Sequence, residues 1–168
     1  MREITICWNN ILGRGTSKAG KVMELTVEFN DKAKSGVKKS FVFGVIEKTA
    51  KESGLEFAPN KKFSMSMAMV NPEEIRRLNK IYRKKDMTTD VLSFSEYKNR
   101  KELELAGDKN VFLGELVLCY NEIERYAGEK KLDLKKELIN VIAHGTLHLL
   151  GFSHGRVMFD IQNKLWTE

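Results

Sequence analysis

The chain has 168 residues, of which 42% are hydrophobic. This length and composition are enough to bury one hydrophobic core of ordinary size but too little for two stable domains. No apolar stretch approaches the roughly 20 residues needed to span a bilayer, and the start of the chain lacks a secretory signal pattern, so we predict a cytoplasmic protein with no membrane partner. Lysine and arginine outnumber aspartate and glutamate by 29 to 23, and the resulting charge of +6 suits a polyanionic partner without identifying one.

The first part of the chain carries strand and helix patterns in turn. Residues 4–8 and 25–29 alternate in side-chain character with the period of half-buried strands. The connector LGRGTSKAGK between them contains no GxxxxGK[ST] phosphate loop, so we interpret it as a flexible loop. Residues 37–53 place apolar side chains at helical spacing, which predicts a helix facing the core. From Phe63, alternating methionines predict another strand and indicate core packing rather than metal binding.

A helix, a strand and a loop are predicted next. Residues 71–74, Asn-Pro-Glu-Glu, combine an N-cap, a first-turn proline and acidic residues, and they predict a helix that ends near Arg83. Residues 91–94 predict a strand. Thr89 and Asp90 precede it, and we interpret them as residues that brace the loop rather than take part in chemistry. The polar stretch 96–110 is interpreted as a long surface loop.

The last predicted elements are a strand over residues 112–120, a short helix and a longer helix over residues 134–150. Asn121 and Glu124 are interpreted as the capping pair of the short helix. Strand and helix patterns are thus mixed along the chain. We predict an α+β fold, a single-domain sandwich of helices around a small mixed β-sheet.

The chain has two cysteines, Cys7 and Cys119, and each lies inside an apolar alternating stretch. This position favours a buried free thiol over a disulfide or half of a metal site. A reducing compartment fits this pattern.

All three histidines fall within the eleven residues HGTLHLLGFSH, from His144 to His154. His144 and His148 are four residues apart, so on a helix they share one face and both rings can reach one ion. If the helix continued, His154 would lie about 9 Å beyond His148, out of reach of metal bonds of about 2 Å. We therefore predict that the helix ends between them, at Gly151 in a left-handed conformation.

Three neutral imidazoles with a fourth position open to water are typical of a catalytic zinc site, so we predict one zinc ion. Nickel, copper and cobalt also bind imidazoles, and accidental proximity of the histidines is the less favoured interpretation. The spacing also resembles the zinc protease pattern HExxHxxGxxH. That pattern needs a glutamate as general base where this chain has Gly145, which argues against a protease.

HGTLHLLGFSH resembles the signature of the YbeY family of bacterial endoribonucleases. The segments LNKIYRKKDMTTDVLSF, residues 78–94, and LGELVLC, residues 113–119, resemble two further motifs of that family in order and spacing. The resemblance runs from about Met23 to the end of the chain. We interpret residues 1–22 as an N-terminal extension or strand, and residues 23–168 as a metal-dependent endoribonuclease domain.

The resemblance implies a zinc-dependent enzyme that cuts single-stranded RNA, matures the ribosomal RNA of the small subunit and associates with the small ribosomal subunit. DNA is not expected as a partner. By motif match, Arg83 joins His144, His148 and His154 as a catalytic residue that would stabilise phosphate charge. Nearby basic residues could form an RNA-binding stripe, although a charge run is usually only a solvated face. These residues are Arg76, Arg77, Lys80, Lys84 and Lys85.

One position departs from the family motif, which has aspartate immediately before the third histidine. This chain has Ser153 there, and serine is a weaker partner than aspartate for orienting a ligand imidazole. We therefore expect weaker metal binding or activity. Two other functions stay open: a non-catalytic ribosome-associated RNA-binding factor with a structural zinc, and, less favoured, a zinc protease.

Overall fold

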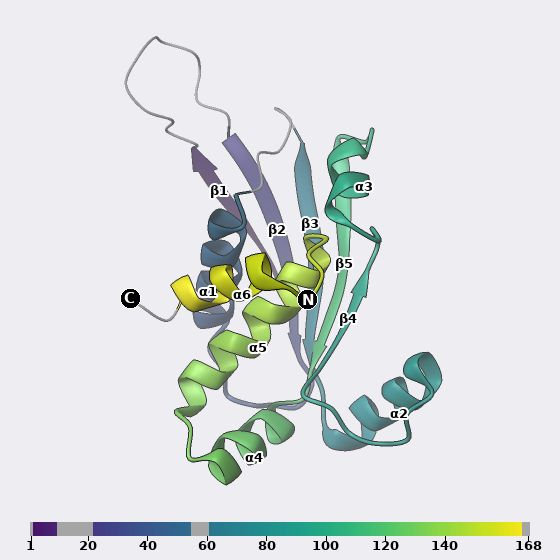
Figure 1. Ribbon diagram of the computed structural model, residues 1–168, viewed down its shortest axis with the longest axis vertical. Helices are drawn as coiled ribbons and strands as arrows, with labels where there is room; N and C mark the ends of the chain where they lie inside the picture. The colour runs from purple at the N-terminus through teal and green to yellow at the C-terminus, as the bar shows by residue number, and fades with distance from the viewer. Residues whose placement is uncertain (1, 10–21, 55–60, 166–168) are drawn as a thin grey trace.

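The structure is a computed structural model that describes residues 2–9, 22–54 and 61–165, with side chains described from Glu24 onward. The connector LGRGTSKAGK lies outside the described residues, as does the side chain of Cys7, so the predictions for both stay predictions. Five strands form one mixed sheet in the order β1-β2-β3-β5-β4 (Figure 1). The strands are β1 (Arg2–Asn9), β2 (Val22–Asp31), β3 (Lys62–Met69), β4 (Val91–Ser95) and β5 (Asn110–Leu118).

The centre of the sheet is parallel and both of its edges are antiparallel. Strands β2, β3 and β5 run parallel, whereas β1 is antiparallel to β2 and β4 is antiparallel to β5. Parallel neighbours need a crossover, and a helix lies between β2 and β3 in the chain. The mixed sheet that the sequence predicts is therefore confirmed.

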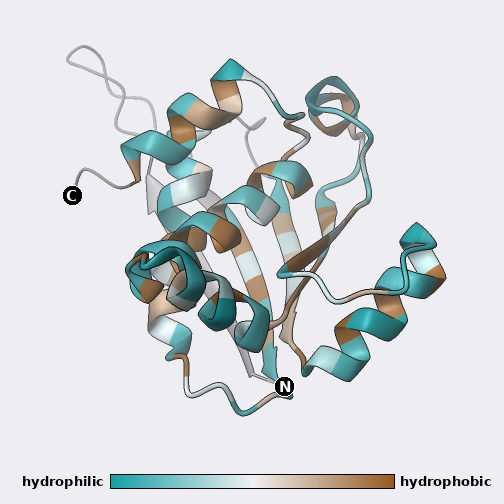
Figure 2. Ribbon diagram, turned by 60° about the horizontal axis from the view of Figure 1, so that its bottom comes forward, coloured by the Kyte–Doolittle hydropathy of each residue, from teal (hydrophilic) through white to brown (hydrophobic). Residues whose placement is uncertain are grey.

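Helices α1, α5 and α6 lie over one face of the sheet, and α2 projects beside the edge strand β4 (Figure 1). Hydrophobic and hydrophilic residues alternate along the strands and around the helices (Figure 2). None of the described helices has the length and apolar character to cross a membrane. The helices are α1 (Lys39–Glu52), α2 (Pro72–Arg83), α3 (Arg100–Leu105), α4 (Tyr120–Lys130), α5 (Leu134–Leu149) and α6 (Arg156–Lys164).

The core lies between the sheet and the helices α1 and α5. Met65, Met67 and Met69 of β3 are at most 1% exposed, and they belong to the same apolar cluster as Phe29 of β2 and Ile142 of α5. Burying a side chain of this size contributes about 1.5–3 kcal/mol. The methionine stripe is therefore core packing, as its alternation predicts.

Helix α2 begins and ends as its sequence predicts. The backbone N–H of Glu74 donates to Oδ1 of Asn71 at 2.9 Å, and Pro72 occupies the first turn, where its missing N–H costs nothing. The helix ends at Arg83, and Lys84 follows in a left-handed conformation with φ of 60°. The prediction for this helix is confirmed.

The interpretation of residues 96–110 as a long loop is wrong, because α3 lies within them. Its cap is local, since the N–H of Glu102 donates to Oδ1 of Asn99 at 3.0 Å. Leu103 is 1% exposed and joins the main core. A six-residue helix that buries one leucine has too few apolar residues to show helical periodicity in the sequence, so it is identified only from the tertiary structure.

The predicted capping pair of Asn121 and Glu124 is also wrong. Helix α4 begins at Tyr120, with Cys119 as an N-cap that makes no side-chain capping bond. The N–H of Cys119 instead donates to the carbonyl oxygen of Asp90 at 2.8 Å, so strand β5 leads directly into the helix. Cys119 is a buried free thiol, as predicted, and burial raises its pKa. Helix α6 has no counterpart among the predicted elements.

Candidate metal centre

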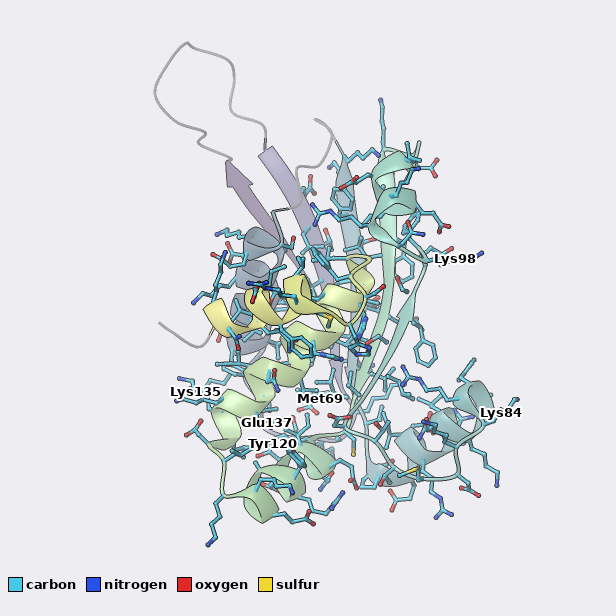
Figure 3. The ribbon with its side chains drawn as sticks, viewed as in Figure 1. Met69, Lys84, Lys98, Tyr120, Lys135 and Glu137 are labelled. Atoms are coloured by element: carbon cyan, nitrogen blue, oxygen red, sulfur yellow. The ribbon has the colours of Figure 1, made fainter. Side chains whose placement is uncertain are left out.

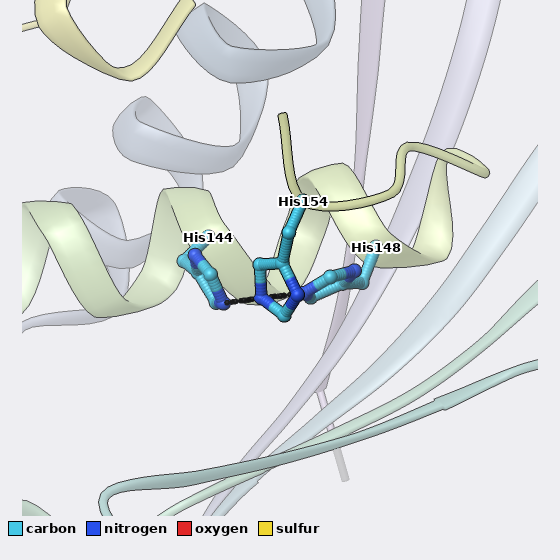
Figure 4. A group of neighbouring side chains, drawn as sticks. All are labelled: His144, His148 and His154. Atoms are coloured by element: carbon cyan, nitrogen blue, oxygen red, sulfur yellow. Dashed lines mark hydrogen bonds between the residues drawn. The ribbon is translucent and has the colours of Figure 1, made fainter. Parts of the chain in front are cut away.

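The three histidines of the chain meet at one point (Figure 4). His144 and His148 lie one turn apart near the end of α5, and His154 comes from the segment that follows it. The Nε2 atom of His148 is 3.1 Å from that of His144, and the Nε2 atom of His154 is 3.2 Å from each of the other two. The three ligand atoms therefore form a nearly equilateral triangle.

This triangle has the size that one metal ion requires. Nitrogens bound to a tetrahedral ion at about 2.0–2.1 Å lie about 3.3 Å from one another. Burial lowers the pKa of both His144 and His148, which favours the neutral ring that can bind a metal. Converging nitrogen lone pairs repel one another unless a cation lies among them. His144, His148 and His154 could therefore hold a metal ion.

Gly151 turns the chain back, as the sequence predicts. Helix α5 ends at Leu149, and Gly151 has φ of +80°, which a residue with a side chain rarely adopts. A Cβ at this position would overlap the backbone of Asn99 and Arg100. The N–H of Arg100 donates to the carbonyl oxygen of Gly151 at 3.0 Å, so the start of α3 holds the turn that carries His154.

Gly145, beside the first histidine, lies against the sheet. A Cβ here would overlap Cδ1 of Leu116, which is fully buried in β5. A side chain at the position that holds the general base in the zinc protease pattern would therefore force Leu116 out of its place in the core. This packing adds a steric reason to the chemical one against a protease.

Two of the three rings differ in what supports them on the side away from the site. Nδ1 of His148 lies 3.0 Å from the carbonyl oxygen of Phe152, an acceptor that places the ring proton on Nδ1 and leaves Nε2 free. Among the described residues, no hydrogen bond joins Ser153 to His154. His154 is also exposed, whereas His144 and His148 are half-buried, so the site opens to solvent on the side of His154.

Arg83 and Asp90 lie within electrostatic reach of the histidines. The pKa of His148 is lowered first by burial, then by His144, and also by the positive charge of Arg83. Burial lowers the pKa of His144, and the carboxylate of Asp90 offsets a small part of this effect. The same carboxylate accepts the N–H of Val91 at 2.8 Å, consistent with a bracing role. Arg83 is exposed and forms no ion pair within the described part of the chain, so its guanidinium is available to a ligand.

Ion pairs neutralise part of the predicted RNA-binding stripe. Arg76 and Lys80 each contact Asp86 at 2.7 Å, and Arg77 contacts Glu74 at 2.8 Å. Lys84 lies at the far end of α2, away from the sheet (Figure 3). Exposed pairs of this kind are weak, about 0–1 kcal/mol, so a phosphate could displace the carboxylates. The stripe stays a prediction, and Asp86 is a feature that sequence reasoning missed.

A cavity of about 500 Å³ lies away from the histidines, on the other face of the sheet. Ser66 and Ala68 line it, and these residues alternate with the core methionines of β3. Three glutamates, Glu28, Glu74 and Glu115, and one lysine, Lys32, also line the cavity. This excess of negative charge disfavours a phosphate there.

Comparison with known proteins identifies relatives along most of the chain. The family model described as Endoribonuclease YbeY matches residues 26–167. The Endoribonuclease YbeY of Sulfurihydrogenibium sp. is 32% identical over 138 residues, which cover 79% of this chain and 84% of the relative. The protein of the same name from Aquifex aeolicus is 40% identical over 109 residues, 65% of this chain and 67% of the relative.

The fold has a solved relative as well. The solution structure of TM1509 from Thermotoga maritima superposes with a TM-score of 0.55 and 26% sequence identity. The match covers 82% of this chain and 85% of that chain. The arrangement of sheet and helices is therefore shared with this protein.

Proposed function

Since the chain belongs to the Endoribonuclease YbeY family, we propose that it is a metal-dependent endoribonuclease that cleaves single-stranded RNA. We further propose that His144, His148 and His154 hold one zinc ion. The observation that carries this proposal is the convergence of three Nε2 atoms within 3.2 Å of one another, in a site open to solvent on one side.

The residues around the proposed metal site would have different roles in binding the metal and the RNA phosphate. A bound zinc ion would supply Lewis-acid polarisation close to the scissile phosphate. The guanidinium of Arg83, which has no ion pair in the described residues, would bind the phosphate oxygens through its planar fork and stabilise charge as the bond breaks. The half-buried rings of His144 and His148 would close one side of the site and leave the side of His154 to the RNA.

Ribosomal RNA is the proposed substrate, and maturation of the small ribosomal subunit in the cytoplasm is the proposed role. The family membership and the net charge of +6 support an RNA partner. Lys84 and Lys85, at the exposed end of α2 beyond Arg83, would add phosphate contacts. The three basic residues of α2 that pair with carboxylates would contribute less.

The test measures cleavage of a single-stranded RNA by untagged wild-type protein. The same assay is run on protein treated with a chelator, on chelated protein to which zinc has been added back, and on the His144→Ala variant. Lys135→Ala, an exposed change on the same helix, is the matched control (Figure 3). We expect cleavage to be lost on chelation and in His144→Ala, regained with zinc, and unchanged in Lys135→Ala. Cleavage that persists without metal overturns the proposal.

The same samples separate the enzyme from a ribosome-associated binding factor with a structural zinc. A binding factor would hold about one equivalent of zinc and bind RNA, but it would cut no RNA under any of these conditions. A 2′,3′-cyclic phosphate on the products would show that the 2′-hydroxyl of the RNA attacks. A 5′-phosphate with a free 3′-hydroxyl, which the 2′-hydroxyl route cannot give, would show attack by water.

A further inference from the structure

His144 directs one ring nitrogen at the other histidines and leaves the second for another partner. Its Nε2 atom lies 3.1 and 3.2 Å from those of His148 and His154, so Nδ1 is on the opposite side of the ring. A neutral imidazole carries one proton, and the nitrogen that keeps it cannot bind a metal. The group that faces Nδ1 therefore decides whether Nε2 is ready for an ion.

Helix α6 brings a candidate for that group. Gln162 is 6% exposed, and its Nε2 donates to Oδ1 of Asn140 at 2.8 Å. Asn140 precedes His144 by one turn of α5, so the two residues share a helix face. The hydrogen bond to Asn140 therefore holds the Gln162 amide beside the His144 ring.

The other end of the Gln162 amide needs a donor. Its Oε1 atom is buried and accepts no hydrogen bond of ordinary geometry from the residues that the structure describes. A buried carbonyl oxygen without a donor destabilises the folded protein, because it has lost its hydrogen bonds to water. Gln162 is also a side-chain hydrogen-bond partner of the His144 ring. The His144 ring is thus the donor within reach.

We propose that Gln162 is a positioning residue whose Oε1 accepts the Nδ1–H of His144 and so fixes the tautomer that presents Nε2 to the metal. This inference rests on the proposed metal site. It gives His144 the support that the Phe152 carbonyl gives His148.

Asn140 sets the direction of the Gln162 amide. Because its Oδ1 accepts, the NH₂ group of Gln162 must face Asn140 and the oxygen must face His144. A reversed amide would donate to Nδ1 and force the ring proton onto Nε2, which would block the metal. The three residues thus form a directed chain across α5 and α6.

The test compares Gln162→Met, which keeps the size but removes the acceptor, with Gln162→Glu, which keeps an acceptor. Asn163→Met, the exposed neighbouring position, is the control. The readouts are the zinc Kd, measured by competition with a chelator, and the ¹⁵N shifts of the His144 ring in metal-free protein. We expect Gln162→Met to weaken zinc binding about 10- to 100-fold and to lose the preference for Nδ1–H, while the other two variants keep both.

If the role of Gln162 is purely structural, Gln162→Met will have a lower melting temperature, but its zinc Kd and the tautomer of its His144 ring will be unchanged. This result would overturn the inference. If this variant does not fold, the wild-type protein still decides, because an Nε2–H tautomer at His144 contradicts the proposal. Wild-type protein that binds no zinc but shows Nδ1–H at His144 would reject the metal site and leave the Gln162 contact in place.

Discussion

Replacing Gly151 with alanine should weaken both the fold and the metal centre. At φ of +80° a side chain is strained by about 1–2 kcal/mol. The new Cβ would also overlap the backbone of Asn99 and Arg100, and overpacking typically adds about 1–3 kcal/mol. We therefore expect a loss of about 2–5 kcal/mol in the free energy of unfolding, or about 4–20 °C in Tm for a domain of this size.

Gly36→Ala is the matched control for this change. Gly36 has nearly the same φ, +77°, but nothing lies within 4 Å of a Cβ built there. This variant should lose only the conformational part, about 1–2 kcal/mol. The difference between the two variants isolates the close approach of the α3 backbone to the turn.

Both variants can be assayed as metal-free proteins by urea unfolding, and then by zinc competition. Because the Gly151 turn carries His154, Gly151→Ala should bind zinc more weakly, whereas Gly36→Ala should bind it as the wild type does. Equal losses of stability in the two variants would refute the role of the close approach. Normal zinc affinity in Gly151→Ala would refute the role of the turn in placing His154.

Three further changes test other parts of the site. Gly145→Ala should lower Tm through its overlap with Leu116, whereas Gly44→Ala, in open space on α1, should raise it. The two should differ by about 1–3 kcal/mol, and an equal rise would contradict the packing argument. Arg83→Ala should slow RNA cleavage about 100- to 1,000-fold at constant zinc content, with Arg83→Lys also impaired, and near-normal turnover would reject the catalytic role. Ser153→Asp should tighten zinc binding about 10- to 100-fold, and an unchanged Kd would show that another group orients the third histidine.

Features that depend on neighbours in sequence follow from the sequence alone. The helical period places His144 and His148 on one face, and the need to bring His154 back predicts the break at Gly151. Alternation likewise predicts β2, and it predicts β3 with its buried methionines. These features are set by local backbone geometry, so a single sequence carries them.

Features that depend on distant segments needed the tertiary structure. Residues 96–110 contain α3, whose backbone holds Gly151 from about fifty positions away in the chain. Gly145 is explained by Leu116 on another element, and Gln162, which contacts Asn140 of α5, lies on a helix that no pattern predicted. The residues in these contacts are far apart in the sequence, and their spacing follows no helical or strand period, so no sequence pattern indicates them. The histidine spacing therefore determined where a metal could bind, and packing between α5, α6, β5 and the α3 segment decided which residues surround it.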